Sequence, residues 1–165
     1  MKNRLPYEST GTAIKGYNDS EIAKWETSDC VVRAFASSFE ISYDYAHKYV
    51  AEEFGRKPRR GTFSTPVKLV KMSDNGIRVN GKKVYPLGER KNDYMINSLD
   101  YPVKVKNEIV NRKMTVGTFV KKYPKGTFFV LVRGHAFTIK DGVVIGNFED
   151  SQKLKRPMRC AFEIK

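Results

Sequence analysis

Cys30 stands in the segment TSDCVVRAFASSF, where a helix is expected to begin. Ser28 or Asp29 can cap that helix, and apolar residues follow Cys30 at helical spacing. The start of a helix favours negative charge, so it lowers the pKa of a thiol placed there. Cys30 is therefore a candidate nucleophile, although a cysteine that only packs in the core would fit the same position.

The two histidines of the chain stand in different contexts. His135 follows Gly134 directly after the apolar run TFFVLVR and begins the run HAFTI, which predicts a place at the rim of a sheet. The small neighbours Gly134 and Ala136 leave room for a substrate beside the ring. His47 lies within the helical pattern YDYAHKYV, where a packed or surface histidine is the better interpretation.

The partner of His135 depends on one turn. A three-residue loop, Lys140 to Gly142, would place Asn147 opposite His135 on the same face of a hairpin. A two-residue Asp141-Gly142 loop would turn Asn147 to the other face, because a shift of one residue reverses every side chain. We expect the three-residue loop, with Asn147 as the orienting group and Asp150 as the alternative.

A helix-start cysteine, then a strand histidine, then Asn or Asp is the order of a thiol hydrolase. The third residue would hold the imidazole of His135 toward the sulfur of Cys30. The backbone N–H of Cys30 would then serve as one oxyanion donor.

The elements that must position these residues are helices first and strands last. Apolar residues at helical spacing, between capping residues, Gly or Pro, predict helices over residues 20–25, 29–39, 43–54, 65–73 and 115–122. Strand patterns occur around Asn80-Gly81, as a hairpin, and in TFFVLV, HAFTI, VVIGNF and CAFEI. We expect one α+β domain over 1–165, with residues 1–18 as an N-terminal arm and a C-terminal antiparallel sheet.

Composition excludes several classes of protein. Hydrophobic residues make up 40% and aromatic residues 12%, which indicates a folded domain. The sequence has no apolar run long enough to span a membrane, and its start lacks the apolar core of a secretory signal. Two distant cysteines are no disulfide framework, so a cytoplasmic setting is expected. We expect no metal and no cofactor, because ligand spacings and phosphate-binding loops are missing.

The charge of the chain is uneven. Residues 1–54 hold six Lys/Arg and nine Asp/Glu, whereas the remaining residues hold 25 and nine. Such a basic surface attracts nucleic acid or acidic proteins without specifying which. The candidates for polyanion binding are in the loop GRKPRRG: Arg56, Lys57, Arg59 and Arg60.

The segments TSDCVVRAFA and KYPKGTFFVLVRGHAFTIKDGVVIGNFED resemble the small papain-like cysteine peptidase domains, above all the compact versions encoded by bacteriophages. The resemblance implies a helical part that carries Cys30, an antiparallel sheet that carries His135 and Asn147, and a cleft between them. It implies acyl transfer from a protein substrate to the thiolate, followed by hydrolysis. The expected setting is the cytoplasm of an infected bacterial host, or the virion, and the substrate would then include a host protein.

The sequence departs from the papain-like pattern before the nucleophile. These enzymes usually place a Gln about six residues before the cysteine as an oxyanion donor, and here that position is Lys24. Lys24, Thr27 and Ser28 are the remaining candidates for this donor. Asp29 also opposes thiolate formation, because its charge is adjacent to the thiol.

Three functions from different classes fit the sequence. The first, which we expect, is a cysteine peptidase or isopeptidase with Cys30 as nucleophile, His135 as base and Asn147 as orienting group. The second is a transglutaminase-like acyltransferase on the same triad. The third is a basic module on an inactive papain-like scaffold that binds nucleic acid or an acidic host protein.

Overall fold

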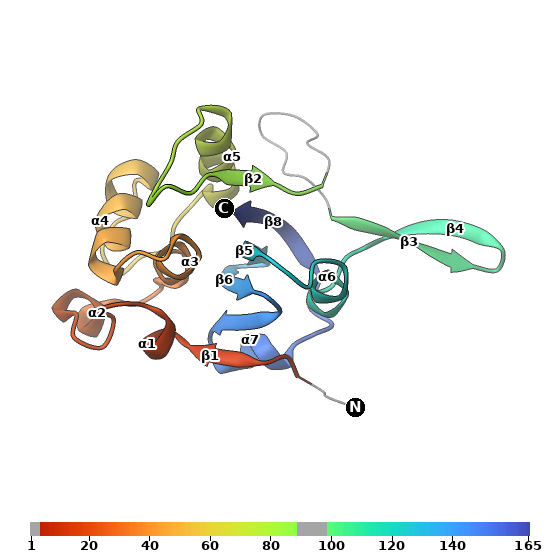
Figure 1. Ribbon diagram of the computed structural model, residues 1–165, viewed down its shortest axis with the longest axis horizontal. Coiled ribbons are helices and arrows are strands. Elements are labelled where there is room, and N and C mark those ends of the chain that lie inside the picture. Colours follow the sequence, from red (N-terminus) through yellow and green to blue (C-terminus); the bar gives the residue numbers. More distant parts are fainter. Residues whose placement is uncertain (1–3, 89–98) are drawn as a thin grey trace.

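The computed structural model describes residues 4–88 and 99–165. The helices are α1 (Thr10–Ala13), α2 (Glu21–Trp25), α3 (Cys30–Phe39), α4 (Tyr43–Phe54), α5 (Thr65–Asp74), α6 (Val116–Lys122) and α7 (Phe148–Gln152). The strands are β1 (Tyr7–Ser9), β2 (Val84–Pro86), β3 (Asp100–Val105), β4 (Glu108–Lys113), β5 (Thr127–Val132), β6 (His135–Lys140), β7 (Val143–Gly146) and β8 (Met158–Ile164). The predicted α+β class is confirmed, with most helices preceding the main strands (Figure 1).

The main sheet is mixed rather than wholly antiparallel. Its strand order is β1-β7-β6-β5-β8-β2, and β1 pairs with β7 in parallel. The remaining neighbours pair antiparallel, as predicted for the C-terminal strands. The predicted N-terminal arm therefore contributes an edge strand and α1 to the fold. Strand β1 was not predicted because Tyr7–Ser9 is too short to show an alternation of apolar and polar residues. Its partner, β7, also lies far along the chain.

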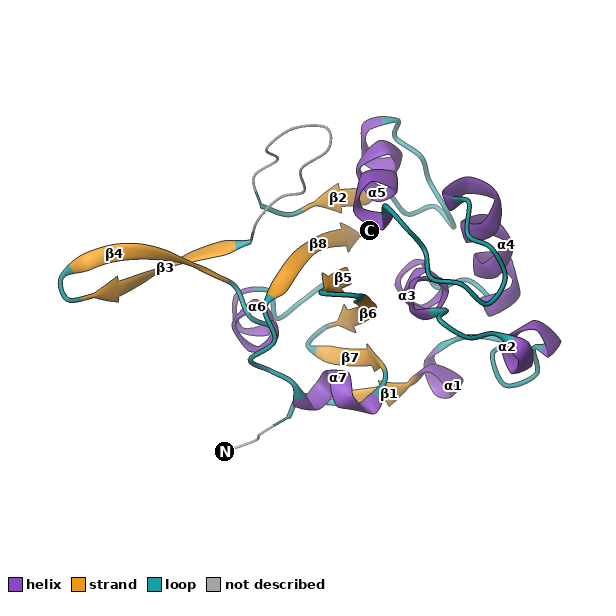
Figure 2. Ribbon diagram, turned by 180° about the vertical axis from the view of Figure 1, so that it is seen from behind, coloured by secondary structure: helices purple, strands orange, loops and turns teal. Residues whose placement is uncertain are grey.

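The two faces of the sheet carry separate apolar clusters, which explains the continuous apolar run of β5. Phe129 and Leu131 pack against the cluster that includes α3, α4 and α5. Phe128 and Val130 pack on the other face with α6. Figures 1 and 2 show these helices on opposite sides of the central strands. Because both faces are covered, every second residue of β5 is buried on each side.

Helix α3 is held to β6 by hydroxyl groups as well as by apolar packing. The hydroxyls of Ser37 and Thr138 lie 2.7 Å apart, and the Thr138 hydroxyl donates to the Ala34 carbonyl at 3.0 Å. Both hydroxyl-bearing residues are buried, so these bonds satisfy groups that would otherwise lack partners. Because α3 begins at Cys30 and β6 begins at His135, this contact positions the two candidate residues.

The turn between β6 and β7 differs from our expectation. Lys140 pairs with Val143, so the loop contains two residues, Asp141 and Gly142, with φ of 48° and 79°. Positive φ at both positions matches a type I′ turn, whose twist suits antiparallel strands. The expected three-residue loop was wrong, and the face of Asn147 changes with it.

The region between α5 and α6 is the least regular part of the fold. Asn80 and Gly81 form the predicted turn, but only Val79 and Lys82 bridge across it, and β2 then pairs with β8. Strands β3 and β4 form a hairpin that extends away from the main sheet (Figure 2). The charged segment from residue 89 onward lies outside the described residues until residue 99. In the described part of the chain, no helix is both long and apolar enough to cross a membrane.

Candidate active site

Cys30 is the first residue of α3 and is partly exposed. Asp29 precedes it as N-cap, without a side-chain capping bond, and Ser28 has a φ of 53°. The first α3 bond at this end runs from the Arg33 amide to the Asp29 carbonyl. The Cys30 amide comes earlier and has no acceptor within the helix, so it can donate to a ligand.

His135 is placed by a two-residue turn between β5 and β6. It pairs with Val132, so the turn consists of Arg133 and Gly134. Gly134 has a φ of 69°, a conformation that favours glycine. The turn puts His135 at the first position of β6, beside the start of α3.

The Cys30 thiol and the His135 ring lie close enough to influence each other. Burial by itself raises the pKa of the Cys30 thiol, whereas hydrogen bonding with His135 and with the Ala136 backbone lowers it. The nearby charges of His135 and Arg33 act in the same direction, and the pKa of Cys30 lies below its ordinary value. The surroundings therefore favour the thiolate, the nucleophilic form of cysteine.

Asp150, from α7, holds the other side of the His135 ring. Its Oδ2 lies 2.9 Å from Nε2 of His135, which leaves Nδ1 for the thiol. Burial opposes the imidazolium, but the bonds to Asp150 and Cys30 raise the pKa of His135 to about 9. Burial would also raise the pKa of Asp150, yet the bond to His135 leaves it lowered. The arrangement favours an imidazolium between two negative groups.

Asp150 is itself held by two further groups. It is almost fully buried, and its Oδ1 accepts from Nη1 of Arg156 at 3.1 Å. Its Oδ2 also accepts from the Asn147 amide at 2.9 Å. A Cβ at Gly146 would lie 2.8 Å from that oxygen and 2.8 Å from Cβ of Phe137, so only glycine leaves room. Neither Gly146 nor Arg156 was predicted from the sequence, although a glycine inside a strand run was an available signal for Gly146.

Asp150, and not Asn147, makes the contact with His135 that we expected of Asn147. The Asn147 side chain accepts a hydrogen bond from Nη1 of Arg33 at 2.9 Å instead of reaching His135. The two-residue turn is the reason, because it takes Asn147 off the face that carries His135. Asn147 instead connects α3 to the segment that leads into α7.

The charge of Asp29 is offset locally. Nε of Arg33 lies 3.2 Å from Oδ1 of Asp29, and the Tyr43 hydroxyl donates to Oδ2 at 2.7 Å. Burial and the bond to Asp29 raise the pKa of Tyr43, so this hydroxyl stays a donor. The repulsion that the sequence suggested is therefore reduced by a neighbouring cation and a neighbouring donor.

The three side chains proposed as oxyanion donors are not placed for that role. Lys24 pairs with Glu21 at 2.9 Å, and the Thr27 hydroxyl donates to the Arg59 carbonyl at 3.4 Å. Ser28 is exposed. None of Lys24, Thr27 and Ser28 lines the cleft at the thiol, because the chain before α3 is turned toward the loop at Arg59.

A cleft of about 500 Å³ opens beside the thiol and the imidazole. The start of α3, the segment 61–67, the ends of β5 and β6 with the turn between them, and one residue of β8 line the cleft. Its lining residues are Cys30, Val31, Gly61, Thr62, Phe63, Ser64, Thr65, Pro66, Val67, Leu131, Val132, Gly134, His135, Ala136 and Arg159.

The other cysteine lies in the core. Cys160 is fully buried in β8, and burial raises the pKa of its thiol to about 12. This agrees with the core position predicted from its alternation with apolar neighbours. The described residues hold no cluster of His, Cys, Asp and Glu that could bind a metal ion.

One of the four basic candidates for polyanion binding is not available. The Arg56 side chain is fully buried and pairs with Glu26, while Nη2 also donates to the Thr27 carbonyl at 3.1 Å. It holds the loop against the chain before α3, so its assignment to polyanion binding was wrong. Lys57, Arg59 and Arg60 are exposed.

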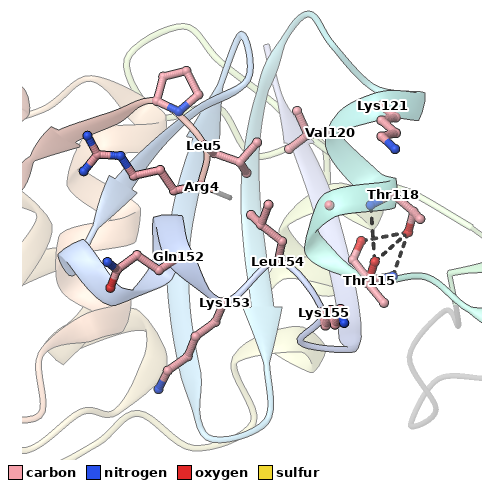
Figure 3. Close-up of a pocket in the computed structure, with 12 residues that line it drawn as sticks. Arg4, Leu5, Thr115, Thr118, Val120, Lys121, Gln152, Lys153, Leu154 and Lys155 are labelled. Carbon is pink, nitrogen blue, oxygen red and sulfur yellow. Dashed lines mark hydrogen bonds between the residues drawn. The ribbon is translucent and has the colours of Figure 1, made fainter. Parts of the chain in front are cut away.

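A larger pocket lies away from the thiol. Its volume is about 870 Å³, and Figure 3 shows it between the N-terminal segment, α6 and the chain after α7. Leu5, Val120 and Leu154 point into it, while Lys121 and Lys155 stand at its rim. Neither Cys30 nor His135 lines it, so the larger volume does not coincide with the reactive groups.

Comparison with models of protein families, with curated proteins and with solved structures finds no match for this chain.

Proposed function

We propose that this protein is a papain-like thiol hydrolase, a cysteine peptidase or isopeptidase that acts on a protein substrate. The observation that carries the proposal is that Cys30 and His135 line one cleft and influence each other's pKa, while Asp150 binds the far side of the His135 ring at 2.9 Å. The thiol stands at a helix start and the imidazole at a strand start, and both stand beside an opening large enough for a peptide segment.

In the acylation step, the Cys30 thiolate attacks the carbonyl carbon of the scissile amide and forms a carbon–sulfur bond. The Cys30 amide donates to the oxyanion. His135, as imidazolium, gives its proton to the leaving nitrogen, and the carbon–nitrogen bond breaks. The products are the amine and a thioester on Cys30.

In the deacylation step, His135 takes a proton from a water molecule that attacks the thioester carbon. The carbon–sulfur bond breaks, the carboxylic acid leaves, and the proton of His135 restores the starting pair with Cys30. Asp150 keeps the ring orientation through both steps, since its bond to Nε2 leaves Nδ1 toward the sulfur.

The test is the rate of Cys30 alkylation by iodoacetamide against pH, in the native protein and in His135→Ala. Peptide mass spectrometry separates Cys30 from Cys160, whose buried thiol serves as an internal reference. We expect fast labelling of Cys30 near pH 6 that is lost in His135→Ala. Labelling that rises only in the free-thiol range and ignores His135 would overturn the proposal.

A further inference from the structure

The cleft beside Cys30 carries one permanent charge. Among the residues that line it, Arg159 is the single cationic side chain apart from His135, and none is a carboxylate. The guanidinium of Arg159 makes no ion pair or hydrogen bond with any residue in the described part of the chain. Because none of these described residues occupies the guanidinium, its donors can bind a ligand that enters the cleft.

A β-bulge places Arg159 there. Leu131 of β5 pairs with Cys160 of β8, whereas the next residue, Val132, pairs with Met158. Arg159 is the extra residue on the bulged strand. Bulges beside active sites often redirect a side chain.

The two apolar clusters show which way the bulge turns Arg159. Cys160 packs with the cluster on the α3 face, and Ala161 with the cluster on the α6 face. Regular alternation from these residues would put Arg159 on the α6 face. Met158 packs on that face instead, and Arg159 lines the cleft with Cys30. The irregular pairing thus moves Arg159 from a buried position on the α6 face to the lining of the cleft.

A second hollow next to the cleft contains further cationic side chains. Phe63 is 81% exposed and stands between this cleft and a second hollow of about 200 Å³. Lys57 and Arg60 line that second hollow. A peptide that crosses Phe63 would meet an apolar surface with cations on both sides, which suits a segment that contains acidic residues.

We propose that Arg159 binds a carboxylate of the substrate next to the scissile bond and so selects acidic substrates. The carboxylate belongs either to an Asp or Glu side chain or to the C-terminus of a peptide. A guanidinium binds both through two parallel hydrogen bonds. This inference rests on the proposed function, because it assigns a specificity to the same cleft.

The first experiment needs no substrate. Cys30 is alkylated with iodoacetate, an anion, and with iodoacetamide, its neutral analogue, in the native protein, in Arg159→Gln and in Arg133→Gln. Arg133 is exposed in the neighbouring turn and does not line the cleft, so it controls for net charge. We expect the rate with iodoacetate divided by the rate with iodoacetamide to fall several-fold in Arg159→Gln. In Arg133→Gln this ratio should stay near the native value. Equal ratios in all three proteins would overturn the inference.

The second experiment identifies the source of the carboxylate. Peptide libraries with one fixed Glu, Gln, Asp or Asn are prepared as free acids and as C-terminal amides, and cleavage is followed by mass spectrometry. A side-chain carboxylate predicts about a tenfold preference for Glu over Gln that Arg159→Gln abolishes. A C-terminal carboxylate predicts a preference for the free acids instead. Cleavage without either preference would overturn the inference.

Failure of this inference differs from failure of the proposed function. If Cys30 alkylation near pH 6 still depends on His135 but shows no preference for an anion, only the role of Arg159 is lost. If Cys30 has no reactivity at low pH, the hydrolase itself is excluded. The urea midpoint of Arg159→Gln should equal that of the native protein, which excludes unfolding as the cause of a lost preference.

Discussion

The protein has two places where a histidine lies near a carboxylate, and they differ in what the carboxylate does. Asp150 binds Nε2 of His135 at 2.9 Å, and the other ring nitrogen is left for a thiol. Glu26 instead pairs with the buried Arg56. Nε2 of His47 lies 3.7 Å from Oε2 of Glu26 and has no hydrogen bond to any described residue. Proximity of a carboxylate therefore does not by itself give a histidine ring a hydrogen bond that fixes its orientation.

Glu26 has a structural role near the start of α3. Glu26 also accepts from the Arg59 amide at 3.2 Å, so it holds the 56–59 loop against the chain that leads into α3. The pair at His135 lies at the edge of a cleft, whereas the Glu26 side chain is buried. The difference separates a carboxylate that holds a loop from one that orients an imidazole at the edge of the cleft.

The largest expected effect is a loss of activity on replacing His135 that does not occur on replacing His47. We expect His135→Ala to reduce hydrolysis by roughly 10²- to 10⁴-fold, because the general acid and base is removed. His47→Gln should keep the native pH profile of Cys30 alkylation, since His47 has no bond to the thiol. Comparable losses in both variants, measured with equally folded proteins, would contradict the distinction.

Breaking the structural pair should affect stability instead. Arg56→Met leaves Glu26 buried without its cation, and the free energy of unfolding should fall by about 3–5 kcal/mol. Urea denaturation measures the change. Glu26→Gln combined with Arg56→Met should recover part of the loss, because no unpaired charge remains. A double variant less stable than Arg56→Met would contradict this explanation.

Gly146→Ala should test the close contact behind Asp150. Its Cβ would approach Oδ2 of Asp150 and Cβ of Phe137 to 2.8 Å, so we expect a loss of about 1–3 kcal/mol in unfolding free energy. The misplaced Asp150 should also slow Cys30 alkylation at pH 6. Gly142→Ala is the control for glycine loss, since a Cβ there meets its nearest atom at 3.6 Å, although its φ of 79° adds strain. Slower alkylation in the control as well would reject a specific effect on Asp150.

The smallest effect should be a shift in pH dependence. Asp150 raises the pKa of His135, so Asp150→Asn should lower that pKa and slow hydrolysis by about tenfold. Activity needs the imidazolium and should fall as pH rises through about 9 in the native protein, and at a lower pH in the variant. Asn147→Ala keeps the hydrogen bond from the backbone amide of residue 147 to Asp150, so it should leave the pH profile of hydrolysis unchanged. An unshifted profile in Asp150→Asn would assign the raised pKa to another group.

Local patterns predicted much of the scaffold. The α4 limits match the predicted 43–54, and α3, α5 and α6 match within about a residue, because caps, Pro and Gly act over a few positions. Strands β5, β6 and β8 also follow their apolar runs, whereas β7 ends at Gly146 and the last residue of the predicted run, Phe148, begins α7. The same local signals put Cys30 at a helix start and His135 at a strand start; that these residues catalyse a reaction stays a prediction.

Only the tertiary structure decided what surrounds those two residues. A turn one residue shorter than expected left the contact with His135 to Asp150 instead of Asn147, since strand side chains alternate. The burial of Arg56 and the parallel pairing of β1 depend on contacts between distant segments, which no local period reveals. The bulge at Arg159 likewise appears only when β8 pairs with β5. Sequence determined the elements, and long-range packing determined which side chains meet at their ends.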